Sequence, residues 1–114
     1  MPDAGKFTRA LRFESPQRHD DGAGDTVVIW QEEFVVSADV FSRMGSEAVL
    51  AARLTGIQPV EITVRRSDRT RRITSDWRAV DARSGEVFAL VSPPADPDGK
   101  RATLRMLGRS GVAS

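Results

Sequence analysis

Arginine is the residue type through which this sequence is best equipped to do chemistry. The segment from Arg65 to Arg72 places five arginines against a single acid, Asp68, within eight residues. A guanidinium binds phosphates and carboxylates through a planar fork of N–H donors, and such a run of like charge favours a solvated tip or a docking surface. We therefore expect a protruding hairpin tip whose candidate contacts with a partner or with phosphates are Arg65, Arg66, Arg69, Arg71 and Arg72.

Three interpretations of this arginine cluster stay open at this point. It could be a solubilising loop, an arm that contacts phosphates, or a docking surface for an acidic partner. The segment contains no aromatic residue, which argues against binding of single-stranded nucleic acid, because base stacking should accompany the charge there.

The sequence offers no catalytic, cofactor or metal site. It has no Cys and no Tyr, and its single histidine, His19, lies beside Asp20 and Asp21 in a turn-forming segment, 17–25. Adjacent side chains in a glycine-rich turn rarely converge on one ion, so we expect a solvated hairpin loop. The nucleophile elbow, the zinc-binding histidine pair, the dinucleotide glycine pattern and the phosphate loop are all missing from the sequence.

A short helix is predicted in the middle of the chain. Ser46 can cap its first turn, and Gly56 can supply a left-handed residue at its end. At about ten residues it is too short to be stable alone, so it must dock on the sheet. Its candidate interface residues are Glu47, Leu50, Arg53 and Leu54.

Strand signals occupy most of the remaining chain. Pro59 precedes an alternation in which Val60, Ile62 and Val64 face a core. The other expected strands are a first one ending at Ser15-Pro16, a hairpin formed by 73–80 and 87–91, and a last strand over 102–107. A long apolar stretch over 26–40 is expected to bend near 31–33, either turning one strand into the next or rounding a barrel corner. Trp30 could be a stacking platform for nucleic acid, but it closes an apolar run, so we expect it in the core. Trp77 could lie in the core or pack against a neighbour.

These elements predict an all-β protein. About six short antiparallel strands would form a small β-barrel or sandwich, with the short α-helix in a long loop over 42–59 and a loose tail over 108–114. At 114 residues the chain fits one domain. It has no apolar run long enough to span a membrane and no apolar leader at its start, so the expected product is intracellular.

Charge is distributed unevenly along the chain. Residues 1–60 carry six basic and nine acidic side chains (6 − 9 = −3), and residues 61–114 carry eleven and seven (11 − 7 = +4). This could be an accident of solvated surface. The alternative is that the acidic side of one subunit meets the basic side of the next in a head-to-tail ring.

The order of these features resembles the bacteriophage head-tail joining family, also called head-closure, stopper or head-tail adaptor proteins, including the versions in gene transfer agents. The residues that carry the resemblance are Ala4-Gly5, Leu11-Arg12-Phe13, Asp21-Gly22, Trp30, Phe34, Ala38-Asp39-Val40, Gly45, Glu47, Ala51-Ala52-Arg53-Leu54, Ile62-Thr63-Val64-Arg65, Arg78-Ala79-Val80-Asp81 and Leu104-Arg105-Met106-Leu107. They span nearly the whole chain, and the segment from Arg53 to Pro59 looks most like gene transfer agent or prophage versions.

The resemblance implies a structural role without an enzyme activity or a cofactor. Such a protein would form a ring of about six or twelve copies between the portal or adaptor protein and the tail terminator or tail tube. It would close the DNA channel after packaging, in the neck of a particle assembled in the bacterial cytoplasm, without contacting a membrane. The channel would be lined by the excursion over 42–59 or by the arginine tip. The alternative is a free-standing nucleic-acid-binding barrel that uses the arginine cluster.

Overall fold

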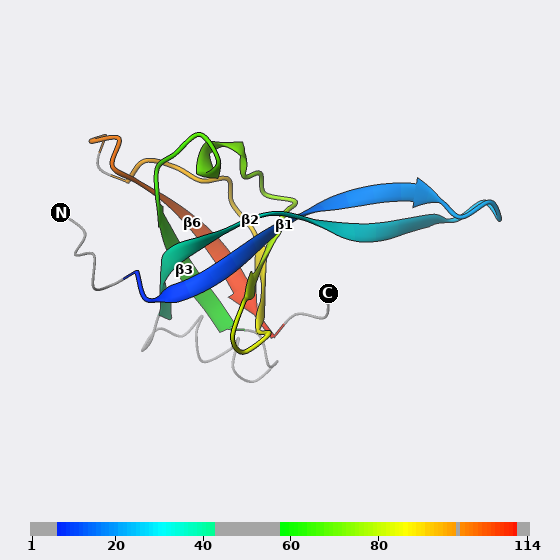
Figure 1. Ribbon diagram of the computed structural model, residues 1–114, viewed down its shortest axis with the longest axis horizontal. Helices are drawn as coiled ribbons and strands as arrows, with labels where there is room; N and C mark the ends of the chain where they lie inside the picture. Colours follow the sequence, from blue (N-terminus) through cyan, green and yellow to red (C-terminus); the bar gives the residue numbers. More distant parts are fainter. Residues whose placement is uncertain (1–6, 43–57, 98, 112–114) are drawn as a thin grey trace.

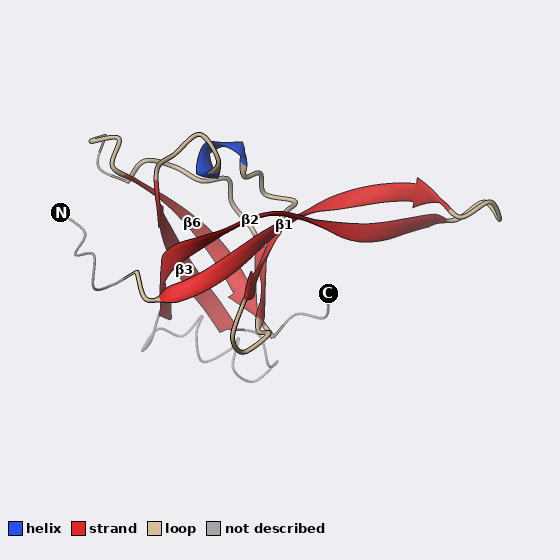
Figure 2. Cartoon of the chain, in the orientation of Figure 1, coloured by secondary structure: helices blue, strands red, loops and turns tan. Residues whose placement is uncertain are grey.

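The chain folds as a closed antiparallel barrel from which one hairpin projects (Figures 1 and 2). The computed structural model describes residues 7–42, 58–97 and 99–111. Its elements are β1 (Arg9–Asp20), β2 (Thr26–Ser42), β3 (Gln58–Arg65), the 3-10 turn η2 (Thr70–Arg72), β4 (Arg78–Asp81), β5 (Val87–Leu90) and β6 (Thr103–Ser110). Neighbouring strands follow the order β1-β2-β3-β6-β5-β4 and close on themselves. The predicted mainly-β fold is confirmed.

Alternating side chains fill the barrel interior. On β3 the predicted Val60, Ile62 and Val64 are all buried, whereas Arg65 is exposed. A chain of aromatic rings crosses the core, with ring centroids 5.5 Å apart for Phe13 and Phe34 and 6.0 Å apart for Phe34 and Trp77. Trp77 therefore belongs to the core, which is one of the two alternatives left open by the sequence.

The projecting hairpin is formed by the distal halves of β1 and β2. Pairing of β1 with β4 ends at Glu14↔Arg78, and pairing of β2 with β3 covers only Ala38–Ser42 on β2. Beyond these limits the two strands pair only with each other, as far as Asp20↔Thr26. Residues 15–32 are called the arm below. The arm lies along the longest of the 51 × 37 × 26 Å dimensions and stands clear of the barrel (Figure 1).

The expected end of the first strand at Ser15-Pro16 is wrong. Strand β1 continues through Pro16, which pairs with Trp30, and ends at Asp20. Because β1 has only one neighbour in the arm, its other side is a free edge, where a proline without an N–H is tolerated. The solvated loop predicted around Asp21 is the tip of this hairpin, and all of residues 17–25 are exposed.

An irregularity lies where the sequence predicted a bend. The register places Phe13 opposite Phe34 but Glu14 opposite Glu32, so Glu33 is an extra residue on β2. Such a bulge bends a strand and increases its twist. It allows β2 to run for 17 residues from the barrel into the arm without a break.

Three further expectations need correction. Strand β6 continues to Ser110, so no loose tail begins at Gly108; that glycine lies in the sheet, where an added Cβ would be 3.2 Å from the Ala89 carbonyl oxygen. Strand β4 begins at Arg78 rather than at residue 73, although its predicted hairpin with β5 is present. Trp30 lies outside the core cluster, because it belongs to the arm. Of the loop predicted over 42–59, Ser42 ends β2 and Gln58 and Pro59 begin β3. The rest of it, with the predicted helix, lies outside the described residues.

Candidate functional site

The arginine segment forms a folded loop between β3 and β4. It is not the predicted hairpin tip, because β3 pairs with β2 and β6 and has no pairing with β4. Buried Thr70 organises the loop: its Oγ1 donates to the Arg65 carbonyl oxygen at 2.8 Å and accepts from the Ser67 amide at 2.8 Å. The Ser67 hydroxyl in turn accepts from the Thr70 amide at 3.1 Å.

The five arginines of the cluster have different environments. Arg72 forms an ion pair with Glu33 at 2.9 Å, and the Arg65 guanidinium lies over the Phe7 ring, 4.8 Å from its centroid. Arg71 is 3.8 Å from exposed Asp68, a separation of little energetic value in water. Among the described residues, Arg66 and Arg69 have no ion pair. Arg65 and Arg72 already have partners within the chain. The interpretation of the arginine cluster as a set of free phosphate contacts therefore loses support.

Four of the five arginines of the cluster line two separate surface hollows. One, of about 450 Å³, is lined by Val36, Ser37, Arg65, Ser67, Asp68 and Arg69. The other, of about 320 Å³, is lined by Arg66, Arg71, Pro94, Asp96, Arg101 and Leu104. It is called the arginine hollow below. Sequence reasoning missed Arg101, which lies some thirty residues beyond the cluster and belongs to a loop before β6. The only signal was its place beside Lys100 in a glycine-containing turn.

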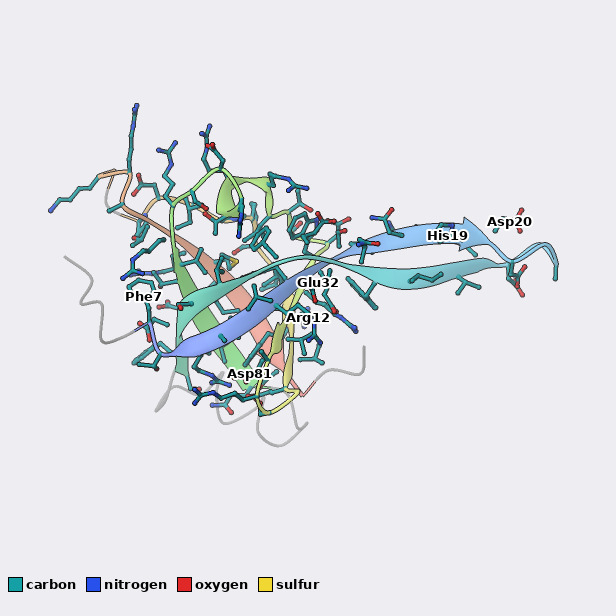
Figure 3. The ribbon with its side chains drawn as sticks, in the orientation of Figure 1. Phe7, Arg12, His19, Asp20, Glu32 and Asp81 are labelled. Carbon is teal, nitrogen blue, oxygen red and sulfur yellow. The ribbon has the colours of Figure 1, made fainter. Side chains whose placement is uncertain are left out.

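The base of the arm is held on one side by a buried carboxylate. Glu14 accepts hydrogen bonds from the Nε atoms of Arg78, at 2.6 Å, and Arg12, at 2.9 Å. Burial alone would raise the pKa of Glu14, but the hydrogen bonds from Arg78 and Arg12 outweigh it and lower that pKa. The Arg78 guanidinium also lies 4.4 Å from the centroid of Trp30. In Figure 3, Arg12 and Glu32 lie together at this junction, 3.9 Å apart at their nearest charged atoms.

The other side of the base is held by Glu33, the extra residue of the bulge. Its two oxygens accept from the Ser15 hydroxyl at 2.6 Å and from Arg72 at 2.9 Å. The arginine loop is thereby connected to the arm. Beyond this point His19 and Asp20 extend outward near the tip (Figure 3).

A third charged cluster lies at the β4–β5 turn. Asp81 accepts hydrogen bonds from the backbone amides of Ser84 and Arg83 and from the Arg9 guanidinium, at 2.8 to 3.0 Å. The bond from the Ser84 amide is the largest effect, and together these bonds outweigh burial and lower the pKa of Asp81 to about 2. The three bonds close the turn, which marks Asp81 as a structural residue.

The remaining predicted site residues are not placed by the structure. Glu47, Leu50, Arg53 and Leu54 lie outside the described residues. Within the described ranges, no group of three or more His, Cys, Asp or Glu side chains is arranged to hold a metal ion. No helix in that part of the chain is long and apolar enough to cross a membrane.

Two solved structures resemble the chain over nearly its full length. A solution structure of protein SF1141 from Shigella flexneri 2a is 20% identical, with a TM-score of 0.67, and the match covers 99% of this chain and 100% of that one. A chain from a structure titled "Virion of native gene transfer agent (GTA) particle" is 25% identical, with a TM-score of 0.64, and the match covers 94% and 96% of the two chains. No curated protein matches significantly.

The family comparison covers the barrel and the arm together. The family described as "Phage head completion protein" matches residues 2–111. That range includes every strand of the barrel, both hollows and the arm. The resemblance deduced from the sequence is confirmed, and this chain belongs to the phage head completion protein family.

Proposed function

We propose that this protein is a head-tail connector of the stopper type in a tailed phage or gene transfer agent. Copies form a ring between the portal or adaptor protein and the tail, retain the packaged DNA and provide the surface on which the tail docks. The observation that carries this proposal is the family match across residues 2–111. The likeness to a chain of a gene transfer agent virion supports the same assignment.

The filled interior of the described barrel favours a DNA channel enclosed by several copies over a channel that runs through one copy. Its interior is occupied by the aromatic and aliphatic core, including Phe13, Ile62 and Met106, none of which is more than 1% exposed. Double-stranded DNA therefore has no path through a single copy. A closed ring, of about six or twelve copies, encloses an axial space by symmetry.

The proposed position of the ring between the head and the tail determines its partners. The portal or adaptor protein lies on the head side, the tail terminator or tail tube protein on the tail side, and double-stranded DNA in the channel. Exposed Arg69, which has no ion pair among the described residues, is our candidate for a phosphate contact. The role needs no catalytic group and no cofactor, and its setting is the neck of a particle assembled in the bacterial cytoplasm.

The test is the fate of particles made without this protein. Electron microscopy of particles from a deletion strain should reveal heads that lack tails and have lost DNA, and a plasmid copy of the gene should restore complete particles. A copy with Arg83→Gln, which removes one charge from an exposed turn, is the matched control and should restore them equally. Complete, DNA-filled, tailed particles in the deletion strain would overturn the proposal.

A further inference from the structure

The arm exposes apolar side chains on both of its faces. The pairs Gln17↔Ile29 and His19↔Val27 place Ile29 and Val27 on one face, and the pair Arg18↔Val28 places Val28 on the other. These three side chains are 54%, 44% and 45% exposed. An isolated two-stranded hairpin is marginally stable in water, and here neither face is covered by another described element. Within the described part of the chain, this apolar surface is therefore left uncovered.

The tip of the arm is acidic. Residues 20–25 contain three aspartates, Asp20, Asp21 and Asp25, and no basic residue. One oxygen of Asp20 accepts from the Gly22 amide at 2.9 Å, and one oxygen of Asp21 accepts from the Ala23 amide at 2.7 Å. These bonds fix the turn and leave the second oxygen of each carboxylate available to a partner.

The arginine hollow offers the opposite chemistry. Leu104, only 6% exposed, and Pro94 supply apolar surface, and Arg66, Arg71 and Arg101 supply three positive charges. Asp96 also lines the hollow, but its two oxygens accept from the Gly99 amide at 3.0 Å and the Arg101 amide at 2.8 Å. The lining thus carries three positive charges against one negative charge. An apolar floor with a cationic rim suits an acidic, partly apolar tip.

The arm cannot reach the arginine hollow of its own chain. In Figure 1 the arm projects from one side of the barrel, and the orange segment around 99–102, which borders the hollow, lies on the opposite side. From Glu14 to Asp20 the arm extends by roughly 20 Å at about 3.3 Å per residue. That reach is comparable to the 26 Å short dimension of the molecule, so a neighbouring copy is within range.

We propose that the acidic tip of each arm inserts into the arginine hollow of the adjacent copy of this chain. The inference rests on the proposed ring and names the contact that closes it. Because the tip and the hollow are different surfaces, the contact is head-to-tail, and it forms a ring when the rotation between copies closes. It gives a structural basis to the opposite charges of the two halves of the chain.

Charge reversal tests the pairing. Asp20→Arg with Asp21→Arg reverses the tip, and Arg66→Glu with Arg101→Glu reverses the hollow. Each pair alone should lower the yield of complete particles at least tenfold, because like charges then face each other. All four substitutions in one chain should restore the yield, since the reversed tip then meets a reversed hollow. Circular dichroism and thermal melting of each purified variant check that the chain still folds.

Cross-linking gives a second readout that does not depend on charge. The chain has no cysteine, so Ala23→Cys at the tip and Pro94→Cys at the hollow create a unique pair. In assembled particles, oxidation should join copies at least tenfold more efficiently than with the control pair Ala23→Cys and Ala82→Cys, which places the second thiol on the turn after β4.

The outcomes separate this inference from the proposed function. Wild-type particle yields from the reversed variants, or cross-linking no better than the control, would overturn the arm contact and leave the connector role intact. A deletion strain that makes complete particles would instead overturn the connector role. Restoration by the fourfold variant, together with tip-to-hollow cross-linking, would establish the contact.

Discussion

Arg72 and Glu33 form a 2.9 Å ion pair between the arginine loop and the base of the arm, although 39 residues separate them in the chain. Glu33 is the extra residue of the β-bulge, and its second oxygen accepts from the Ser15 hydroxyl at 2.6 Å. One carboxylate therefore joins three segments: β1, β2 and the loop after β3. The direction of the arm and the position of the loop are mechanically linked through it.

We expect Glu33→Ala to be more destabilising than Arg72→Ala. The Arg72 side chain is 59% exposed, so losing its ion pair should cost less than about 1 kcal/mol. Losing Glu33 also leaves the hydroxyl of buried Ser15 without its acceptor, which raises the cost to about 2 kcal/mol. Urea denaturation of both variants measures the difference, and equal losses would contradict this account of the bulge.

Asp81 should govern part of the acid sensitivity of the fold. Its pKa is about 2 in the folded chain and near 3.8 ordinarily. A carboxyl group with a depressed folded pKa contributes stability that is complete above its unfolded pKa and is lost as the pH falls through its folded pKa. The window here is therefore about pH 4 down to about pH 2. Asp81→Asn should be less stable than the wild type at pH 7, and the two melting curves should converge across that window. A gap that stays constant from pH 7 to pH 2 would refute the assignment.

Thr70 should be needed for the shape of the arginine loop. Thr70→Val keeps the volume but removes the hydroxyl that bonds the Arg65 carbonyl and the Ser67 amide, at a cost of about 1 to 3 kcal/mol. Thr70→Ser keeps the hydroxyl and should recover most of that loss. Hydrogen exchange of the loop amides should accelerate in the valine variant alone. Equal behaviour of the two variants would show that the hydroxyl does not hold the loop.

The apolar residues of the arm should matter to assembly and not to folding. Val27→Thr with Ile29→Thr changes only exposed positions, so the free energy of unfolding should shift by less than about 0.5 kcal/mol per site. Particle assembly should fall, because the proposed contact between copies would bury this part of the arm beside the tip. Val64→Thr is the matched control: Val64 is fully buried, and a hydroxyl there should cost about 1 to 3 kcal/mol. A large loss of stability from the arm substitutions would contradict the description of an uncovered arm.

The sequence was informative where side chains alternate against a core. Val60, Ile62 and Val64 on β3 are buried as predicted, and the predicted last strand is present as β6. The arm was missed because Val27, Val28 and Ile29 have the same β-branched character as core residues, and local sequence does not reveal whether a strand has one neighbour or two. Pro16 reinforced the error, since its tolerance depends on the free edge that only the pairing reveals.

Residues that lie far apart in the chain were the other source of error. Five clustered arginines predicted one functional surface, but the fold commits Arg72 to Glu33 and Arg65 to Phe7. It also brings Arg101 beside Arg66 and Arg71. No local pattern contains that juxtaposition, because it arises from the pairing of β3 with β6.

The bulge at Glu33 gives the arm the properties of a lever. Strands β1 and β2 cross from barrel to arm without interruption, so an angular change at the base appears at the tip multiplied by the arm's length. A bend of about 20° at the base would move the tip by roughly 7 Å over a reach of roughly 20 Å. In a ring joined by such arms, gaining or losing one residue at this position would reset the angle between successive copies. Within the proposed ring, the diameter would thus be adjustable by a single insertion or deletion that leaves the barrel unchanged.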